Sequence, residues 1–348
     1  MSMDSDFNKF YYDQGKLPAT MGCRTYLMSN VNGEAGVEGR GNIAPVTINL
    51  PRIGIIASRS SESEEKVIEK FFEVLNKRLE QGRDSLMHRY SVLKNLKVSD
   101  LPFIAGQKLI VGSEELGESD NIEEILRQGS WGIGFIGLSE TLVALVGENH
   151  AKSTRTRELG ERIVQFIRDF TDRTTQELKL NFSCYATPAE GLSGKLIVQD
   201  KKMFGIIPGV TDKDYYTNSY HIPVGEIISI TEKLKIEAPY HKMCNAGHIS
   251  YIEFDGNPTG DTIEDVLRWA YTNTDISYLG MNFHIRYCKE CGTYLYSGEQ
   301  HCTSCNSTNI QGISRVTGYL SLDERFGPGK EAEKADRKDH NKEHRKTY

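Results

Sequence analysis

Residues 288–320 read CKECGTYLYSGEQHCTSCNSTNIQGISRVTGYL and hold the most informative pattern in the chain. Four cysteines form two C-x-x-C pairs that ten residues separate. Each C-x-x-C turn places two thiolates about one tetrahedral edge apart, so two turns complete the four-sulfur shell that zinc prefers. We therefore expect zinc at Cys288, Cys291, Cys302 and Cys305. Four protein ligands leave no open coordination position, which indicates structural zinc. An iron–sulfur cluster and an unliganded thiol-rich loop are the alternatives.

The composition excludes several classes of protein. The 348 residues include 42 basic and 48 acidic side chains, for a net charge of −6, which is unlike a duplex-binding protein. The longest apolar stretches, such as residues 131–138, are far shorter than a membrane span, and the first residues resemble no signal peptide. The seven cysteines are an odd number, which argues against a disulfide framework. We expect a reduced, cytoplasmic location.

The apolar periodicity predicts alternating strands and helices. Strands are expected at 42–50, 131–138 and 180–186, and helices at 61–79, 141–146, 155–170 and 262–271. Such alternation is typical of a largely parallel α/β architecture. From residue 330 onward the chain is almost entirely charged, which predicts a solvated helix or a frayed tail.

The sequence TPAE at residues 187–190 is typical of a helix start after a strand. Thr187 would be the N-cap, Pro188 the first helical residue and Glu190 the partner of a capping box. A strand that leads into a helix N-terminus offers N–H groups and a favourable dipole to a phosphate. A plain helix cap without a ligand is the alternative.

The sequence RVTGY within residues 313–320 resembles the radical loop of the glycyl radical enzymes. With the four-cysteine ribbon directly before it, it resembles specifically the anaerobic (class III) ribonucleoside-triphosphate reductases. Other segments resemble the same family in the family's order: 21–25 with 39–51, 185–194 and 241–250. An isolated glycine is usually an ordinary turn residue. The resemblance to this family therefore depends on the whole set of motifs in the family's order, and not on Gly318 alone.

The resemblance implies roles for four residues. Gly318 would carry the stored radical, because a Cα without a side chain can flatten and be approached closely. Cys23 would be the thiyl residue that takes the 3′-hydrogen of the ribose before the 2′-hydroxyl leaves as water; the alternative is a small buried apolar residue. Thr25 stands where aerobic relatives carry a glutamate base, so another proton acceptor is needed. Asn42 is a candidate polar contact in that pocket or a strand cap.

The resemblance also implies that the turn after the third predicted strand holds the substrate's phosphates. The residues concerned are Thr187, Pro188, Ala189, Glu190 and Gly191. We expect backbone contacts, because the Glu190 carboxylate would repel a phosphate.

Cofactors and partners follow from the same resemblance. A separate activating enzyme with a [4Fe-4S] cluster and S-adenosylmethionine would install the radical. Formate is the expected reductant, with a dithiol as the alternative, because zinc claims the C-x-x-C pairs. The substrates would be ribonucleoside triphosphates, which are reduced for DNA synthesis. The complete enzyme would be a homodimer that neither associates with a membrane nor binds nucleic acid directly.

The expected fold is the C-terminal portion of a ten-stranded α/β reductase barrel. Residues 1–286 would form barrel, with a cysteine finger loop near 22–42; residues 287–306 would form the zinc ribbon, and 307–348 the glycyl radical loop and charged tail. Only 22 residues precede Cys23, whereas the family has a long segment there. We therefore expect a split or truncated enzyme whose N-terminal half is a separate polypeptide.

Two other functions remain open from the sequence. The chain could be another glycyl radical enzyme, although those usually lack this ribbon. It could also be a zinc-ribbon protein that binds nucleic acid or a protein partner, which the acidic balance disfavours.

Overall fold

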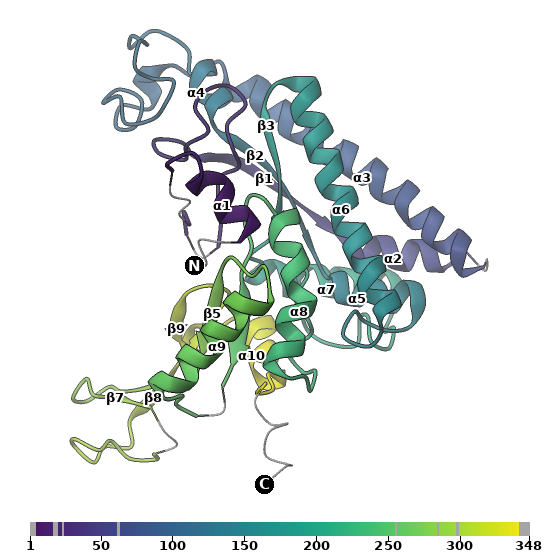
Figure 1. Ribbon diagram of the computed structural model, residues 1–348, viewed down its shortest axis with the longest axis vertical. Helices are drawn as coiled ribbons and strands as arrows, with labels where there is room; N and C mark the ends of the chain where they lie inside the picture. The colour runs from purple at the N-terminus through teal and green to yellow at the C-terminus, as the bar shows by residue number, and fades with distance from the viewer. Residues whose placement is uncertain are drawn as a thin grey trace.

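Three sheets organise the chain (Figure 1). The computed structural model describes residues 5–16, 20–22, 24–60, 63–254, 256–283, 285–296 and 299–340. Within these residues, a three-stranded parallel sheet is followed along the chain by a two-stranded parallel sheet and a four-stranded antiparallel sheet. The mixed α/β architecture expected from the alternation is confirmed.

The first sheet has the strand order β1-β2-β3 and is parallel throughout. Its strands are β1 (Asn42–Asn49), β2 (Ser130–Ile136) and β3 (Asn181–Ala186), each within two residues of its prediction. Helices connect them: α2 (Leu50–Ser58), α3 (Glu64–Leu93), a 3₁₀ turn (Val98–Asp100) and α4 (Glu123–Gln128) before β2, then α5 (Leu138–Val146) and α6 (Thr154–Leu178) before β3.

Helices α3 and α6 are both longer than predicted. In α3 the buried positions continue through Leu79, Gly82 and Leu86, but a glycine in the series interrupts the apolar pattern. Gly82 lies against β1, where a Cβ atom would be 3.3 Å from a methyl group of Val46. No helix in the described part of the chain is long and apolar enough to cross a membrane.

The two faces of the first sheet differ. One face packs against α2, α3, α5 and α6 and forms the main apolar core, which includes Trp131, Ile133 and Phe135. On the other face Tyr185 lies over β2, where a Cβ atom on Gly134 would be 2.6 Å from the ring and one on Gly132 would be 3.0 Å away. The glycines of β2 are therefore needed for the close approach of an aromatic ring.

The middle of the chain brings the N-terminal segment beside β3. Here lie α7 (Gly191–Phe204), α8 (Ile230–Met243), β4 (Ser250–Glu253), α9 (Gly260–Asn273) and β5 (Leu279–Asn282), and α8 contacts the N-terminal helix α1 (Asp6–Tyr12). The Ala186 amide donates to Gly247, which in turn forms an antiparallel bridge with Thr25. The residues that follow Cys23 are thereby attached to the first sheet.

The third sheet, with the order β7-β6-β8-β9, lies at the other end of the molecule from α3 (Figure 1). Its strands are β6 (Ile285–Cys288), β7 (Tyr294–Leu295), β8 (Ile310–Arg315) and β9 (Leu320–Leu322), followed by a 3₁₀ turn (Asp323–Arg325) and α10 (Pro328–Asp336).

The prediction of a solvated helix or a frayed tail is wrong for residues 330–340. Helix α10 packs on α7, and a Cβ atom on Gly329 would lie 3.1 Å from the Cα of Gly194. Lys330 and Glu333 are each 4% exposed and His340 is 5% exposed. The pattern of charges misled the prediction because these groups pair with one another inside the protein. Residues 341–348 lie outside the described residues.

We predict that Glu333→Gln destabilises the chain. The substitution removes the carboxylate that pairs with the buried Lys330 and the half-buried Arg337. Breaking a buried ion pair costs about 3–5 kcal/mol, so the free energy of unfolding in urea should fall by that order. Glu331→Gln, an exposed position on the same helix, is the matched control. Equal stabilities for the two variants would contradict the buried pairing.

Candidate active site and metal centre

The two cysteine turns share one backbone design. In the first, Gly292 donates to the Cys288 carbonyl and has a φ of 77°; in the second, Asn306 donates to the Cys302 carbonyl and has a φ of 57°. Glycine and asparagine are the residues that adopt this left-handed conformation most readily. Asn306 carries a signal that is visible in the sequence, because its spacing from Cys302 matches that of Gly292 from Cys288.

The four sulfur atoms form one compact group. All lie within 4.8 Å of one another, with 3.6 Å between Cys288 and Cys305 and 3.4 Å between Cys291 and Cys302. A tetrahedral zinc with bonds of about 2.3 Å would separate its sulfurs by about 3.8 Å. The described cysteines therefore fit a closed four-sulfur zinc site.

The four-cysteine ribbon is joined to the segment that carries Gly318 by a strand ladder. Strand β6, which ends at Cys288, pairs antiparallel with β8, and Cys288 lies opposite Ile310. Strand β8 then pairs with β9, and the two form a hairpin whose tip is residues 316–319. Gly318 is half-buried at this tip, which we call the glycine hairpin.

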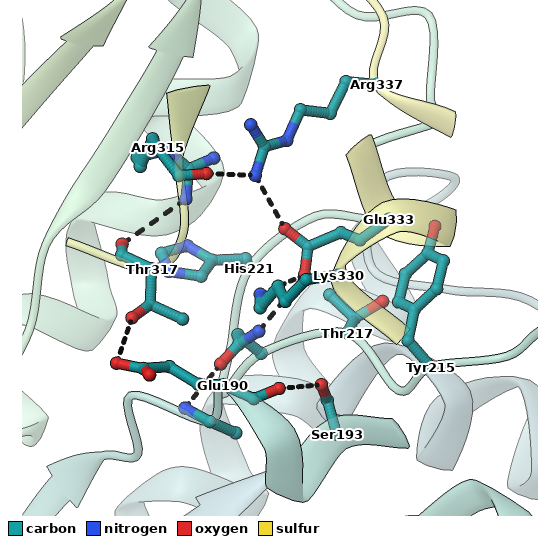
Figure 2. A network of polar contacts seen from close by, with 12 residues as sticks. Glu190, Ser193, Tyr215, Thr217, His221, Arg315, Thr317, Lys330, Glu333 and Arg337 are labelled. Atoms are coloured by element: carbon teal, nitrogen blue, oxygen red, sulfur yellow. Dashed lines mark hydrogen bonds and ion pairs between the residues drawn. The ribbon is translucent and has the colours of Figure 1, made fainter. Parts of the chain in front are cut away.

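Several side chains hold the glycine hairpin from outside. The Tyr251 hydroxyl donates to the Thr317 carbonyl. The Glu190 carboxylate accepts from the Thr317 hydroxyl at 3.5 Å (Figure 2). It also accepts from the Tyr319 hydroxyl at 3.0 Å. Because Thr317 and Tyr319 flank Gly318, Glu190 contacts the residues on both sides of it.

Cys23 lies outside the described residues, but the residues after it are placed. Thr25 is half-buried at its bridge to Gly247. Arg24 is 1% exposed, and its guanidinium donates to the Thr187 carbonyl at 2.8 Å and contacts the ring of His221 at 2.9 Å.

Arg24 and Thr317 line the same cavity, of about 30 Å³, which we call the central cavity. The residue after Cys23 and the residue before Gly318 therefore meet across one small space. The other lining residues come from the loop 215–224, helix α8, strand β4, strand β8 and the C-terminal segment: Tyr215, Thr217, Asn218, His221, Ile222, Val224, Lys233, Tyr251, Glu253, Arg315, Glu333 and His340.

Buried charge surrounds this cavity (Figure 2). The Arg315 guanidinium donates to Glu253 at 2.7 Å and lies 3.7 Å from the centre of the Tyr251 ring. Burial opposes the ionisation of Glu253, but Arg315 and Arg337 outweigh it and lower its pKa to about 2. Burial of the Lys330 amine lowers its pKa to about 8 despite the neighbouring Glu333.

The turn after β3 differs from the prediction. Helix α7 begins at Gly191 with Glu190 as its N-cap, and no side chain caps it, so the capping box based on Thr187 and Pro188 is wrong. The Ala189 amide donates to Asn218 at 2.7 Å, and the Thr187 hydroxyl contacts that of Thr47. The Glu190 carboxylate does not form the local cap, because it hydrogen-bonds to Thr317 and Tyr319 of the glycine hairpin instead.

Asn42 does not lie with the other predicted site residues. It is exposed at the first position of β1, where it accepts a hydrogen bond from Ser130. Thr187, by contrast, follows the last residue of β3 and contacts Thr47 near the other end of β1. The expected pocket contact is therefore not seen, and the alternative role beside the strand start fits better.

Sequence reasoning missed several polar residues of the central cavity. Arg24, Glu253, Arg315 and Glu333 are charged residues in segments that look like ordinary loops, strands or tail. Arg24 and Arg315 had one usable signal, since Arg24 belongs to the segment 21–25 and Arg315 is the first residue of RVTGY.

Comparison with solved structures identifies the fold. A solved anaerobic ribonucleotide reductase superposes with a TM-score of 0.71 at 18% identity, over 87% of this chain and 46% of the other. The Thermotoga maritima anaerobic ribonucleotide reductase with glycerol in its active site gives a TM-score of 0.66 at 18% identity, over 92% and 46%. At such identities the likeness shows the fold alone.

Sequence comparison identifies the family. The family model described as anaerobic ribonucleoside-triphosphate reductase matches residues 1–340, and the chain belongs to this family. The anaerobic ribonucleoside-triphosphate reductase of Escherichia coli K12 is 35% identical over 92% of this chain and 46% of its own length. That of Enterobacteria phage T4 is 33% identical over 86% and 49%. The chain thus spans about half the length of the curated relatives it matches.

We predict that Cys291→Ser abolishes stoichiometric zinc, because three thiolates leave the four-sulfur shell incomplete. Elemental analysis should give about one zinc ion per wild-type chain and a small fraction of that in the variant. Proteolysis should then cut between residues 285 and 327, while the main core, which holds no ribbon residue, keeps the far-ultraviolet circular dichroism. Thr303→Ala, exposed between the second pair, should retain zinc. Full zinc content in Cys291→Ser would contradict the assigned ligands.

Proposed function

We propose that this chain is the radical-bearing part of an enzyme that reduces ribonucleoside triphosphates to 2′-deoxyribonucleoside triphosphates under anaerobic conditions. Gly318 stores the radical, and Cys23 receives it and takes the 3′-hydrogen of the ribose. The meeting of Arg24 and Thr317 across the central cavity carries the proposal, because each is the chain neighbour of one radical residue.

Glu190 is the proposed proton acceptor. Thr25 has a hydroxyl in place of a base, whereas Glu190 is a carboxylate held against both neighbours of Gly318. Because the Glu190 carboxylate is bonded to Thr317 and Tyr319, it does not have to face the substrate's phosphates, which it would repel.

We propose that the phosphates bind at the first turn of α7. This turn begins at Gly191, where Thr187, Pro188 and Ala189 lead the chain out of β3. The first N–H groups of a helix lack intrahelical partners, and the helix dipole favours an anion there. The Ala189 amide is already bonded to Asn218, so the contacts fall to Gly191 and the residues after it.

Zinc is the proposed structural metal, and its role is to brace the glycine hairpin. Cys288 is itself a residue of strand β6, and β6 pairs with β8, the first strand of the glycine hairpin. The cysteine turns are therefore connected directly to the hairpin. A separate activating enzyme with S-adenosylmethionine and a [4Fe-4S] cluster installs the radical, and formate supplies the reducing equivalents.

The proposed partner is the other half of the reductase barrel. Among the described residues β1 pairs only with β2, which leaves its second edge without a ladder. Parallel strands are normally buried within a sheet, and an open edge is a template for pairing. We propose that another portion of the enzyme, as a separate polypeptide, pairs there to complete a ten-stranded barrel. The complete enzyme is then a cytoplasmic homodimer. In this proposal residues 1–286 belong to the barrel, residues 287–306 form the zinc ribbon, and residues 307–348 form the glycyl radical loop and the charged tail.

We predict that anaerobic incubation with the activating enzyme gives an electron paramagnetic resonance doublet from the single α-hydrogen of Gly318. Gly318→Ala should lose the doublet, because alanine has a single α-hydrogen and its removal would leave none to split the signal. Gly327→Ala is the matched control, since a Cβ there meets nothing within 4 Å.

The same samples supply the contrary outcome. A doublet that survives in Gly318→Ala would remove this residue as the radical site. The wild-type chain should also form deoxyribonucleotide once the partner half is added. A normal doublet with no deoxyribonucleotide produced under those conditions would contradict the proposed reaction.

A further inference from the structure

The three residues that follow the expected thiyl cysteine pair with a second segment of the chain. The Tyr26 amide donates to the Ala246 carbonyl at 2.8 Å, and the His248 amide donates to the Arg24 carbonyl at 3.1 Å. Residues 24–26, which we call the cysteine segment, are therefore held by a short antiparallel ladder.

The His248 ring adds a side-chain contact to this ladder. It stacks against the Tyr26 ring, with 4.9 Å between the ring centres and 20° between the ring planes. The Phe7 ring of helix α1 meets it edge-on at 4.6 Å. His248 and Tyr26 are both buried. One residue thus contacts the cysteine segment through its backbone and through its side chain.

Both ring nitrogens of His248 are used in hydrogen bonds. Nδ1 lies 2.7 Å from the Cys244 carbonyl oxygen, which can only accept, so Nδ1 carries the proton and donates. In the neutral ring Nε2 is then an acceptor, and the Ser277 hydroxyl donates to it at 2.5 Å. Burial lowers the pKa of His248 to about 4, so the ring is neutral at pH 7. These two bonds fix its orientation.

The hydrogen bonds continue through a second buried histidine. The Ser277 amide donates to Nδ1 of His241 at 3.2 Å, so Nε2 carries the proton and donates to the Ser250 hydroxyl at 3.0 Å. Burial and the neighbouring His248 hold the pKa of His241 well below its usual range. We call His248, Ser277, His241 and Ser250 the buried histidine chain. It joins helix α8 and strand β4 to the residues before β5, and none of its members lines the central cavity.

We propose that His248 is a positioning residue for Cys23. The buried histidine chain fixes the His248 ring, and the ring and amide of His248 fix the cysteine segment and with it the residue that comes before. The inference rests on the proposed function for the role of Cys23. A buried network of this kind is directional, and loss of one member leaves another polar group unpaired, so the position of the segment depends on each bond.

The first test is hydrogen exchange of the full zinc-loaded chain, measured by mass spectrometry on peptides that contain residues 24–26. His248→Phe keeps an aromatic ring beside Tyr26 but removes both nitrogens, so the Cys244 carbonyl and the Ser277 hydroxyl lose this partner. The cysteine segment should then exchange on the order of tenfold faster, because two buried hydrogen bonds that hold its neighbour are gone.

His150→Phe is the matched control. The His150 imidazole is also fully buried, and burial lowers its pKa to about 4 as well, but its Nε2 contacts the Tyr220 carbonyl and not the cysteine segment. Exchange at residues 24–26 should match wild type in this variant. Ser277→Ala is a smaller change that leaves the His248 ring in place and removes the hydroxyl donor to Nε2. It should accelerate the same exchange about threefold.

The second test uses the activated enzyme with its partner half. His248→Phe should keep the paramagnetic doublet of Gly318 and the KM for the ribonucleoside triphosphate. It should lower kcat on the order of tenfold, because a thiyl residue out of place slows the hydrogen transfer without weakening the binding of phosphate. His150→Phe should leave all three quantities unchanged.

Four results would overturn the proposal. They are equal exchange at residues 24–26 in Ser277→Ala and wild type, equal acceleration by His150→Phe and His248→Phe, loss of the doublet in His248→Phe, and a raised KM with unchanged kcat in that variant. Hydrogen exchange needs neither the radical nor the partner half. A wild-type chain that makes no deoxyribonucleotide would therefore contradict the proposed function alone.

Discussion

The antiparallel ladder between β6 and β8 is the contact on which the proposed radical site depends. It places Cys288 opposite Ile310 and Ile285 opposite Ile313, so the strand that ends in the metal site is bonded to the strand that leads to Gly318. The third sheet is small and only partly buried, and little apolar area stabilises it. In such a module the free energy of metal binding becomes the free energy of local folding. Zinc at the cysteine quartet, as proposed, would therefore also hold the position of Gly318, which binds no metal.

Short-range features of the structure were predictable from the sequence. The spacing of the cysteines fixed their turns, and the β-branched runs located β1, β2 and β3 within two residues. These features depend on neighbours in the chain. The predicted capping box at Thr187 and Glu190 is wrong because the bonding of Glu190 depends on residues that are distant in the chain. Its carboxylate finds partners more than a hundred residues away, at Thr317 and Tyr319, and no local pattern carries that information.

The C-terminal segment shows the same limit in its charges. A run of alternating charge usually indicates a solvated surface, yet Lys330, Glu333 and Arg337 lie against Arg315 at the base of the glycine hairpin. Such pairs add little net stability compared with apolar packing, but they are directional, and each broken pair is costly. We interpret the cluster as a device that fixes the position of the hairpin. It also leaves Arg24 as the one cation lining the central cavity, among the described residues, that makes no ion pair with a carboxylate.

The central claim is that the cysteine segment and the glycine hairpin meet. A disulfide requires Cα atoms about 4.4–6.8 Å apart, so cross-linking measures this approach directly. In the zinc-loaded variant Gly318→Cys, mild oxidation should link residue 318 to Cys23, and peptide mass spectrometry should identify the joined peptides. Tyr319→Cys, at an exposed neighbouring position, should form no such link. Failure of Gly318→Cys to link to Cys23, or equal linking by both variants, would contradict the account.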